Sequence, residues 1–151
     1  RSLGLMERNS FTAAWQGPLQ LPVPDAFAPR WSPDGTTLVY DIRSNTQGIG
    51  VFPLGGVPRV LVQQTAELTR PSWPEWSPDG RSIYFTASDA NNVRGVYQIP
   101  AAGGTPQLVV RFDVPRLRPY SGGIPSLGNG LIYFVLVELE SDIYVMDLVR
   151  K

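Results

Sequence analysis

The pentapeptide Trp-Ser-Pro-Asp-Gly occurs twice in the chain, at residues 31–35 and 76–80, so that its two tryptophans are 45 residues apart. In each copy Pro presets φ, Asp can accept hydrogen bonds from its own turn, and Gly tolerates a positive φ, which together predict a tight turn. An apolar run follows each turn, at residues 38–40 and 83–85, and its residue types favour a strand. A period of this length is typical of repeated units of four strands.

The match between the two copies extends beyond the pentapeptide. Polar stretches at residues 43–48 and 88–92 predict hairpin loops, and Gly-Gly pairs at 55–56 and 103–104 predict tight turns into the last strand of each unit. A third, eroded copy begins at residue 126, where Ile132 lies 49 residues after Ile83 but the pentapeptide is absent. No segment of ten or more residues shows a helical period. The sequence therefore predicts an all-β chain.

Residues 29–35 and 74–80 both read Pro-x-Trp-Ser-Pro-Asp-Gly, and with the strand, polar loop and Gly-Gly pair that follow, each unit resembles the TolB-type, WD-like β-propeller repeat. The resemblance covers roughly residues 26–148. It implies propeller blades of four antiparallel strands that belong to a six-bladed ring. The third copy departs from the pattern because it lacks the Trp, Pro and Asp of the turn.

The length of 151 residues holds only about three blades at about 45 residues each. We expect residues 1–25 to supply outer strands of a partial preceding blade, 26–70 and 71–118 to form two blades, and 119–151 to form an eroded or partial final blade. The chain is then a half-propeller. It is either the C-terminal half of a larger propeller protein or one half of a homodimer that closes a six-bladed ring. The homodimer has a physical motive, because an open half would expose apolar blade faces.

Composition limits the chemistry of the chain. The sequence has no His and no Cys, which excludes a Ser-His-Asp triad, a histidine base, His-containing zinc sites and disulfides. The 13 basic and 13 acidic residues balance, so nothing favours nucleic acid or an anionic membrane surface. No run approaches the ~20 apolar residues of a membrane helix, so membrane insertion is not expected. We predict no catalytic residues, no cofactor and no metal.

Several conspicuous residues are best explained by structure. Asp34 and Asp79 are expected to accept hydrogen bonds from the backbone of their turns, and Trp31 and Trp76 to pack between neighbouring blades. Six other aromatic residues are expected in the core: Tyr40, Tyr84, Phe85, Tyr97, Tyr133 and Phe134. Two acidic groups are interpreted as turn or solvated loop residues, with a bound cation as the alternative: Asp89 with Asn91 and Asn92, and Glu138 with Glu140 and Asp142.

Binding residues are expected just before the Trp-Ser-Pro-Asp-Gly turns, because in the family the innermost strand, which lines the axial channel, leads into that turn. Arg and aromatic residues gather there, a composition enriched where partners bind. The candidate partner-binding residues are Arg30, Arg70, Trp73, Glu75, Arg116, Arg118 and Tyr120. In the alternative interpretation these arginines pair with nearby carboxylates on an ordinary surface.

The resemblance implies a non-catalytic module that binds a protein or peptide. The closing residues 141–148 also resemble the C-terminal sensor domains of bacterial Ser/Thr kinases, so the module could belong to such a larger protein. The residues do not determine the compartment, and the resemblance favours the periplasm or the extracytoplasmic side. Two alternatives stay open: a self-assembling half-propeller with a structural role, and a propeller hydrolase or lyase with an axial metal.

Overall fold

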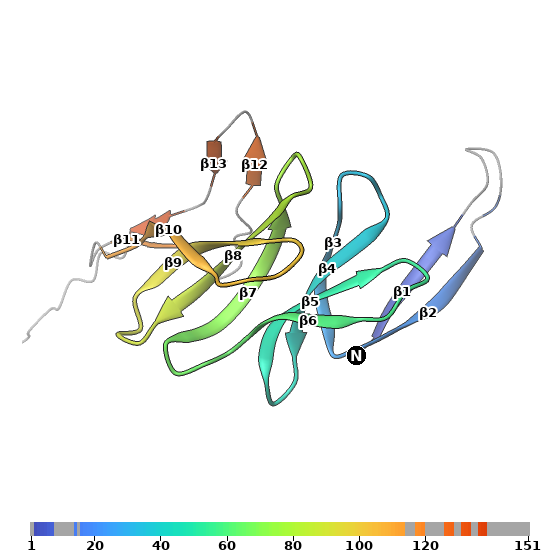
Figure 1. Cartoon of the computed structure of the whole chain (residues 1–151), viewed down its shortest axis with the longest axis horizontal. Coiled ribbons are helices and arrows are strands. Elements are labelled where there is room, and N and C mark those ends of the chain that lie inside the picture. Colours follow the sequence, from blue (N-terminus) through green and yellow to red (C-terminus); the bar gives the residue numbers. More distant parts are fainter. Residues whose placement is uncertain are drawn as a thin grey trace, which may run out of the picture.

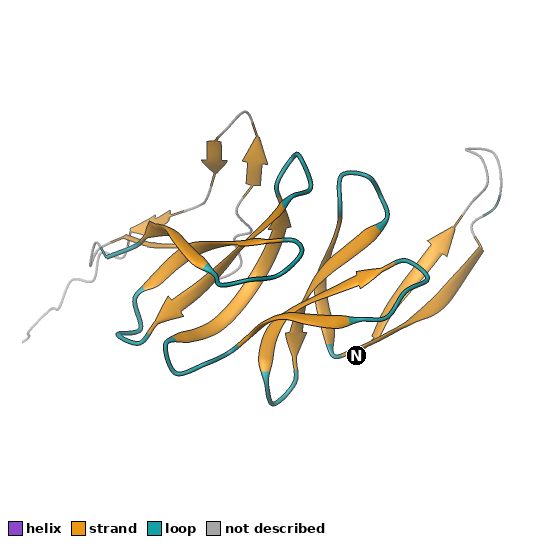
Figure 2. Cartoon of the chain, viewed as in Figure 1, coloured by secondary structure: helices purple, strands orange, loops and turns teal. Residues whose placement is uncertain are grey.

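The computed structural model describes residues 2–7, 14, 16–113, 117–119, 126–128, 131–133 and 136–138. The described residues contain strands and no helix (Figure 2), which confirms the predicted all-β class. One four-stranded antiparallel sheet has the order β3 (Ala26–Trp31), β4 (Thr37–Arg43), β5 (Gln47–Pro53) and β6 (Arg59–Gln63). A second has the order β7 (Leu68–Trp76), β8 (Ser82–Asp89), β9 (Arg94–Pro100) and β10 (Gln107–Arg111).

Three two-stranded pairs complete the described structure. The strands β1 (Ser2–Glu7) and β2 (Gln16–Pro24) pair at the N-terminal end, and β2 leads directly into the first four-stranded sheet. The other pairs join β11 (Leu117–Pro119) to β14 (Leu136–Glu138), and β12 (Ser126–Gly128) to β13 (Leu131–Tyr133). The two four-stranded sheets lie side by side (Figure 1), with β7 packed against β3, β4 and β5 of the first sheet. The strand β7 begins at Leu68 and so crosses the predicted division between residues 70 and 71.

The two Trp-Ser-Pro-Asp-Gly segments form the same turn. Asp34 Oδ1 accepts hydrogen bonds from Ser32 Oγ at 2.5 Å and from the backbone N–H of Thr36 at 3.0 Å. In the second copy Asp79 Oδ1 accepts hydrogen bonds from Ser77 Oγ at 2.6 Å and from the backbone N–H of Arg81 at 3.1 Å. These hydrogen bonds lower the pKa of both carboxyl groups. The predicted structural role of the two aspartates is confirmed.

The hairpin connections also follow the predicted chemistry. Gly55-Gly56 lies in the turn between β5 and β6, and Gly103-Gly104 in the turn between β9 and β10. Between β8 and β9, Asp89 Oδ1 accepts from the backbone N–H groups of Asn91 and Val93, each at 2.9 Å. The interpretation of this segment as a turn is therefore confirmed.

The largest core cluster lies between the two four-stranded sheets. Trp76 is 8% exposed and packs with Val39, Ile49 and Val51 of the first sheet, and its indole N–H donates to the carbonyl of Arg30 at 3.3 Å. Phe85 and Tyr97 stack in the same cluster, and Tyr40 is buried in a second cluster beside β2. The predictions for these four aromatic residues are confirmed.

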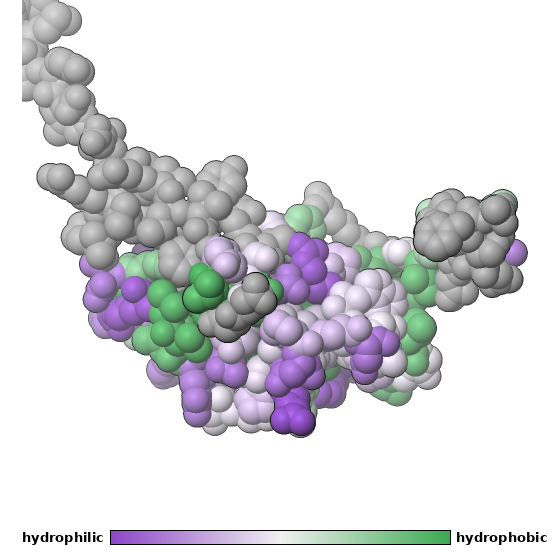
Figure 3. Space-filling view, turned by 90° about the horizontal axis from the view of Figure 1, so that it is seen from above, coloured by the Kyte–Doolittle hydropathy of each residue, from purple (hydrophilic) through white to green (hydrophobic). Residues whose placement is uncertain are grey.

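The prediction that Trp31 packs between neighbouring blades as Trp76 does is not met in the described structure, where Trp31 is 42% exposed. A complete four-stranded sheet precedes Trp76, whereas the described residues that precede Trp31 form the β1–β2 pair. Tyr133 is likewise 55% exposed on the short strand β13, contrary to expectation, while Tyr84 is half-buried. Phe134, Glu140 and Asp142 lie outside the described residues. Figure 3 shows apolar surface toward the end that carries β1 and β2 and toward the opposite end.

The inner strands β3 and β7 share an unusual backbone feature. Asp25 and Arg70 have φ of 55° and 52°, and Ala28 and Trp73 have φ of 48° and 57°. Each pair is 45 residues apart, so the same two positions of both repeats are left-handed. The pairing of β3 with β4, and of β7 with β8, shifts register beside these residues. Such bulges bend a strand and re-aim its side chains, and here they bring β7 toward β4.

Candidate functional site

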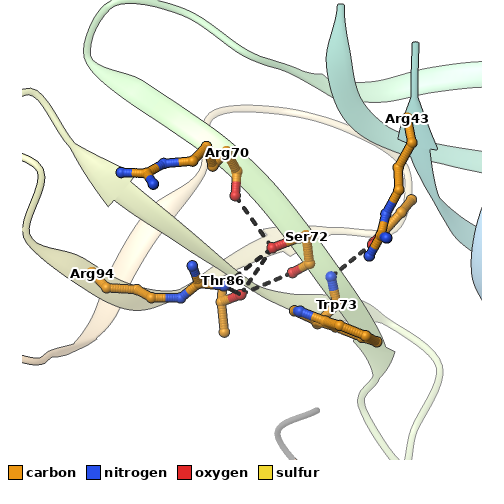
Figure 4. Close-up of polar contacts among 7 residues, drawn as sticks. Arg43, Arg70, Ser72, Trp73, Thr86 and Arg94 are labelled. Carbon is orange, nitrogen blue, oxygen red and sulfur yellow. Dashed lines mark hydrogen bonds and ion pairs between the residues drawn. The ribbon is translucent and has the colours of Figure 1, made fainter. Parts of the chain in front are cut away.

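A pocket of about 400 Å³ opens where the inner strand β7 meets β4 and β5 of the neighbouring sheet, with β9 at its side. Most of its lining residues have polar or charged side chains. It consists of Asp41, Ile42, Arg43, Ser44, Gln47, Arg70, Pro71, Ser72, Trp73 and Arg94. The polar contacts at its centre are shown in Figure 4.

Asp41 joins the two sheets across this pocket. Its side chain lies on β4, only 1% of the residue is exposed, and Oδ1 accepts the backbone N–H of Trp73 on β7 at 2.7 Å (Figure 4). Oδ2 lies 3.4 Å from Arg43 Nη2. Burial raises the pKa of Asp41 to about 6, against the smaller lowering effects of the Trp73 hydrogen bond and the Arg43 charge. Asp41 is thus a carboxyl group that is costly to ionise and that holds β7 in place.

Arg43 lies over two aromatic rings at the rim of the pocket. Its Cζ is 3.6 Å from the ring centroid of Phe27 and 5.5 Å from that of Trp73. The two rings meet edge to face, with centroids 5.9 Å apart and planes at 72°. A guanidinium over aromatic faces is attracted by their quadrupoles. Because the Arg43 side chain is 45% exposed, the cluster presents a cation and an aromatic surface to solvent.

Arg94, the first residue of β9, supplies a more deeply placed cation. Its Nη2 donates to Thr86 Oγ1 at 2.8 Å and to Ser72 Oγ at 3.2 Å (Figure 4). Its Nε is buried and has no hydrogen-bond partner, and no carboxylate of the described residues forms an ion pair with it. Burial, and then the charge of Arg70, lower the pKa of Arg94.

Backbone strain is concentrated in the wall of the pocket that β7 provides. Trp73 is a bulky residue at φ 57°, and Arg70 has φ 52°; such conformations cost roughly 1–2 kcal/mol each for residues with a Cβ. Specific hydrogen bonds hold both residues. The N–H of Arg70 donates to Gln64 Oε1 at 3.0 Å, and the N–H of Trp73 donates to buried Asp41. Strain of this kind is often retained where a site needs a particular side-chain direction.

The structure brings two of the predicted site residues into this pocket. Arg70 and Trp73 both line it, and the guanidinium of Arg70 also hydrogen-bonds Asn92. Arg30 and Glu75 instead contact each other, with Nε 3.2 Å from Oε2, and both are partly buried. The two residues occupy equivalent positions of the two repeats, and their ion pair joins the two sheets. Neither residue lines the pocket.

The remaining predicted residues are less fully placed. Arg118 belongs to the short strand β11, for which the structure describes the backbone. Arg116 and Tyr120 lie outside the described residues. The structure therefore does not test whether these three residues join the pocket.

Sequence reasoning missed four residues of the site: Asp41, Arg43, Thr86 and Arg94. The sequence did contain a signal for Asp41 and Arg43. Both are charged residues that come just after the apolar run of a strand, which ends at Tyr40. The second repeat has Thr86 where the first has Asp41, which marks one register position as polar in both units. Arg94 follows a polar loop and carries no such signal.

Neither a cluster of metal-ligating side chains nor a membrane-spanning helix is found in the part of the chain that the structure describes. Within it, no three His, Cys, Asp or Glu side chains lie close enough together to hold a metal ion. No helix there has the length and apolar character needed to span a bilayer.

The chain is similar in structure to a protein described as a candidate TolB from Agrobacterium tumefaciens. The two superimpose with a TM-score of 0.63 at 20% sequence identity, over 89% of this chain and 50% of the other. This chain thus spans half the length of that protein. No family model matches the sequence, and no match was found among curated proteins. The fold is TolB-like and β-rich.

Proposed function

We propose that the chain is part of a TolB-like β-propeller that acts as a non-catalytic protein-binding module, and that its partner contacts the pocket between β4, β7 and β9. One observation carries this proposal. Two predicted binding residues, Arg70 and Trp73, meet Arg43 and Arg94 in a pocket of about 400 Å³. Exposed arginine beside aromatic surface is the composition that dominates binding energy at protein interfaces.

The chemistry of the site supports binding rather than catalysis. The sequence contains no His and no Cys, so the commonest general base and the most nucleophilic side chain are absent. Asp41, the carboxylate of the pocket, is buried and accepts the N–H of Trp73. It is therefore engaged in holding the strands together.

The organisation of the chain fits a module within a larger ring. The β3–β6 and β7–β10 sheets support two consecutive blades, close to the predicted ranges 26–70 and 71–118 although β7 already begins at Leu68, and the β1–β2 pair supports a partial preceding blade. Residues 119–151 are proposed to belong to a further blade. The likeness to kinase sensor domains rests on residues 141–148, which lie outside the described residues, and stays a prediction. So does the extracytoplasmic location.

A selection from a displayed peptide library tests the proposal. Selected peptides are expected to bind the wild-type chain and to bind Arg43→Ala at least about tenfold more weakly, because an arginine anchor commonly contributes 1.4 kcal/mol or more. The matched control is Arg59→Ala, which removes an exposed arginine of β6 that does not line this pocket. Peptides that bind all three proteins equally would place the binding surface elsewhere.

A second candidate function is self-assembly of the half-propeller. The observation that favours it is the 42% exposure of Trp31, whose counterpart Trp76 is buried by a complete preceding sheet. Two copies related by a two-fold axis could cover such surfaces. Light scattering after size exclusion should then give twice the 16.6 kDa of one chain, and Trp31→Ser should return the mass to that of a monomer.

A further inference from the structure

We propose that the pocket recognises a carboxylate group of its partner, from either an acidic side chain or a chain terminus, and that the guanidinium of Arg94 is the group that binds it. This inference rests on the proposed protein-binding function and specifies the chemistry of the partner. It follows from the hydrogen-bonding state of Arg94, from the groups that fix its position and from the charges around it.

Arg94 has hydrogen-bonding capacity that the described residues do not use. A guanidinium carries five N–H donors, and here only Nη2 donates, to the hydroxyls of Ser72 and Thr86. The buried Nε has no partner. A buried donor without an acceptor, in a cation without a carboxylate, is unfavourable in isolation. A ligand with two acceptor oxygens would relieve that cost.

The orientation of Arg94 is fixed before any ligand arrives. Thr86 Oγ1 donates to the carbonyl of Ser72 at 3.1 Å, and Ser72 Oγ lies 3.3 Å from the carbonyl of Arg70, so both hydroxyls can direct lone pairs at Nη2. Figure 4 shows the hydroxyls of Ser72 and Thr86 beside the Arg94 guanidinium. Because the acceptors that hold Arg94 are neutral hydroxyls, its positive charge can still attract an anionic ligand. Because its orientation is already fixed, the side chain loses little conformational entropy when a ligand binds.

The neighbouring charges favour an anionic ligand. Arg43 is paired with Asp41, and Arg70 is an exposed side chain whose guanidinium hydrogen-bonds Asn92. Arg94 is thus the one cation lining the pocket that has neither an ion pair nor an amide partner among the described residues. A carboxylate is the anionic group that a protein partner supplies, and its oxygens can accept from guanidinium N–H groups of Arg94 that the described residues leave unused.

The test is an NMR titration of the wild-type chain with three short peptides of otherwise identical sequence. The first carries one glutamate and blocked ends, the second carries glutamine and blocked ends, and the third carries glutamine and a free carboxyl terminus. Inorganic phosphate is titrated separately. The variants are Arg94→Gln, Arg94→Lys and the control Arg81→Gln, which changes an exposed arginine at the opposite end of β8.

A carboxylate peptide, the first or the third, is expected to bind the wild-type chain at least about tenfold more tightly than the blocked glutamine peptide, as for a charge-assisted contact. The preference should vanish in Arg94→Gln, weaken in Arg94→Lys and persist in Arg81→Gln. Whether the first or third peptide binds more tightly identifies the source of the carboxylate. If Arg94→Gln does not fold, Arg94→Lys is compared with Arg81→Gln instead. An equal preference of these two variants for the carboxylate peptides over the blocked glutamine peptide would overturn the assignment to the guanidinium.

Three results would overturn the inference. If all three peptides bind equally and shift signals of the pocket, the site binds peptides without recognising a carboxylate, and the proposed function survives alone. Tighter binding of phosphate than of both carboxylate peptides would show that the anionic group was wrongly assigned. If neither these peptides nor those from library selection bind at all, the proposed function fails, and this inference fails with it.

Discussion

Replacement of Asp41 by Asn tests the electrostatic description of the pocket. Asp41 is 1% exposed, and burial raises its pKa from 3.8 to about 6. Because the pKa is raised in the folded state, the group favours folding when protonated, and its contribution is lost as pH rises through about 6. The difference between 3.8 and about 6 corresponds to about 3 kcal/mol of unfolding free energy over the whole titration.

The assay is chemical denaturation of the wild type and Asp41→Asn at several pH values. An asparagine can still accept the N–H of Trp73 through its amide oxygen but does not ionise. The unfolding free energy of Asp41→Asn minus that of the wild type should rise by about 2 kcal/mol between about pH 4 and about pH 7. Other carboxyl groups, including Asp34 and Asp79, titrate in both proteins and cancel in this difference.

Asp41→Ala separates the hydrogen bond from the charge. It removes the acceptor at 2.7 Å from the N–H of Trp73, so it should be less stable than Asp41→Asn at every pH, by about 1–3 kcal/mol. The reasoning is refuted if the difference between the wild type and Asp41→Asn is independent of pH, or if it falls as pH rises. The first result would mean that Asp41 ionises in the folded chain as readily as in the unfolded one, and the second that it ionises more readily.

Three further predictions concern packing and pairing between the sheets. Trp76→Ala should destabilise the chain by about 3–5 kcal/mol, since it removes a buried side chain of the core between the sheets. Trp31→Ala should cost distinctly less in the same denaturation assay, and equal costs would contradict the assigned packing. A double-mutant cycle on Arg30 and Glu75 should give a small, salt-sensitive favourable coupling below about 1 kcal/mol, because both side chains are partly exposed; a coupling of zero would show that the ion pair does not stabilise the fold. Gly50→Ala should lower the thermal midpoint, because a Cβ there would overlap a buried tyrosine ring, and an unchanged midpoint would show that the ring can move aside.

Local chemistry explains why much of the fold could be predicted from the sequence. The turns at residues 31–35 and 76–80 depend on hydrogen bonds within a few residues, such as those that Asp34 accepts from Ser32 and Thr36. The period of 45 residues then places the same strands in both units. The expectation for Trp31 was not met because its burial depends on which strands precede it, and the β1–β2 pair covers less than a full sheet.

The candidate site was harder to predict because it is built from contacts between repeats. The position of Trp73 depends on a left-handed backbone and on a hydrogen bond to Asp41, 32 residues earlier. No residue type in β7 signals that conformation, which is uncommon for a bulky side chain. Arg30 and Glu75 each lie directly before the tryptophan of a turn, which is why both were predicted to bind a partner. Because they occupy the same position in adjacent repeats, they form an ion pair with each other instead.

Amide hydrogen exchange with and without a library-selected peptide tests the central claim most directly. A partner that contacts the pocket is expected to slow exchange in β7 around Arg70 and Trp73, near Arg43 on β4 and at Arg94 on β9. Strong protection confined to the turns at residues 31–35 and 76–80, or an unchanged exchange pattern despite binding, would contradict the assignment of this pocket as the binding site.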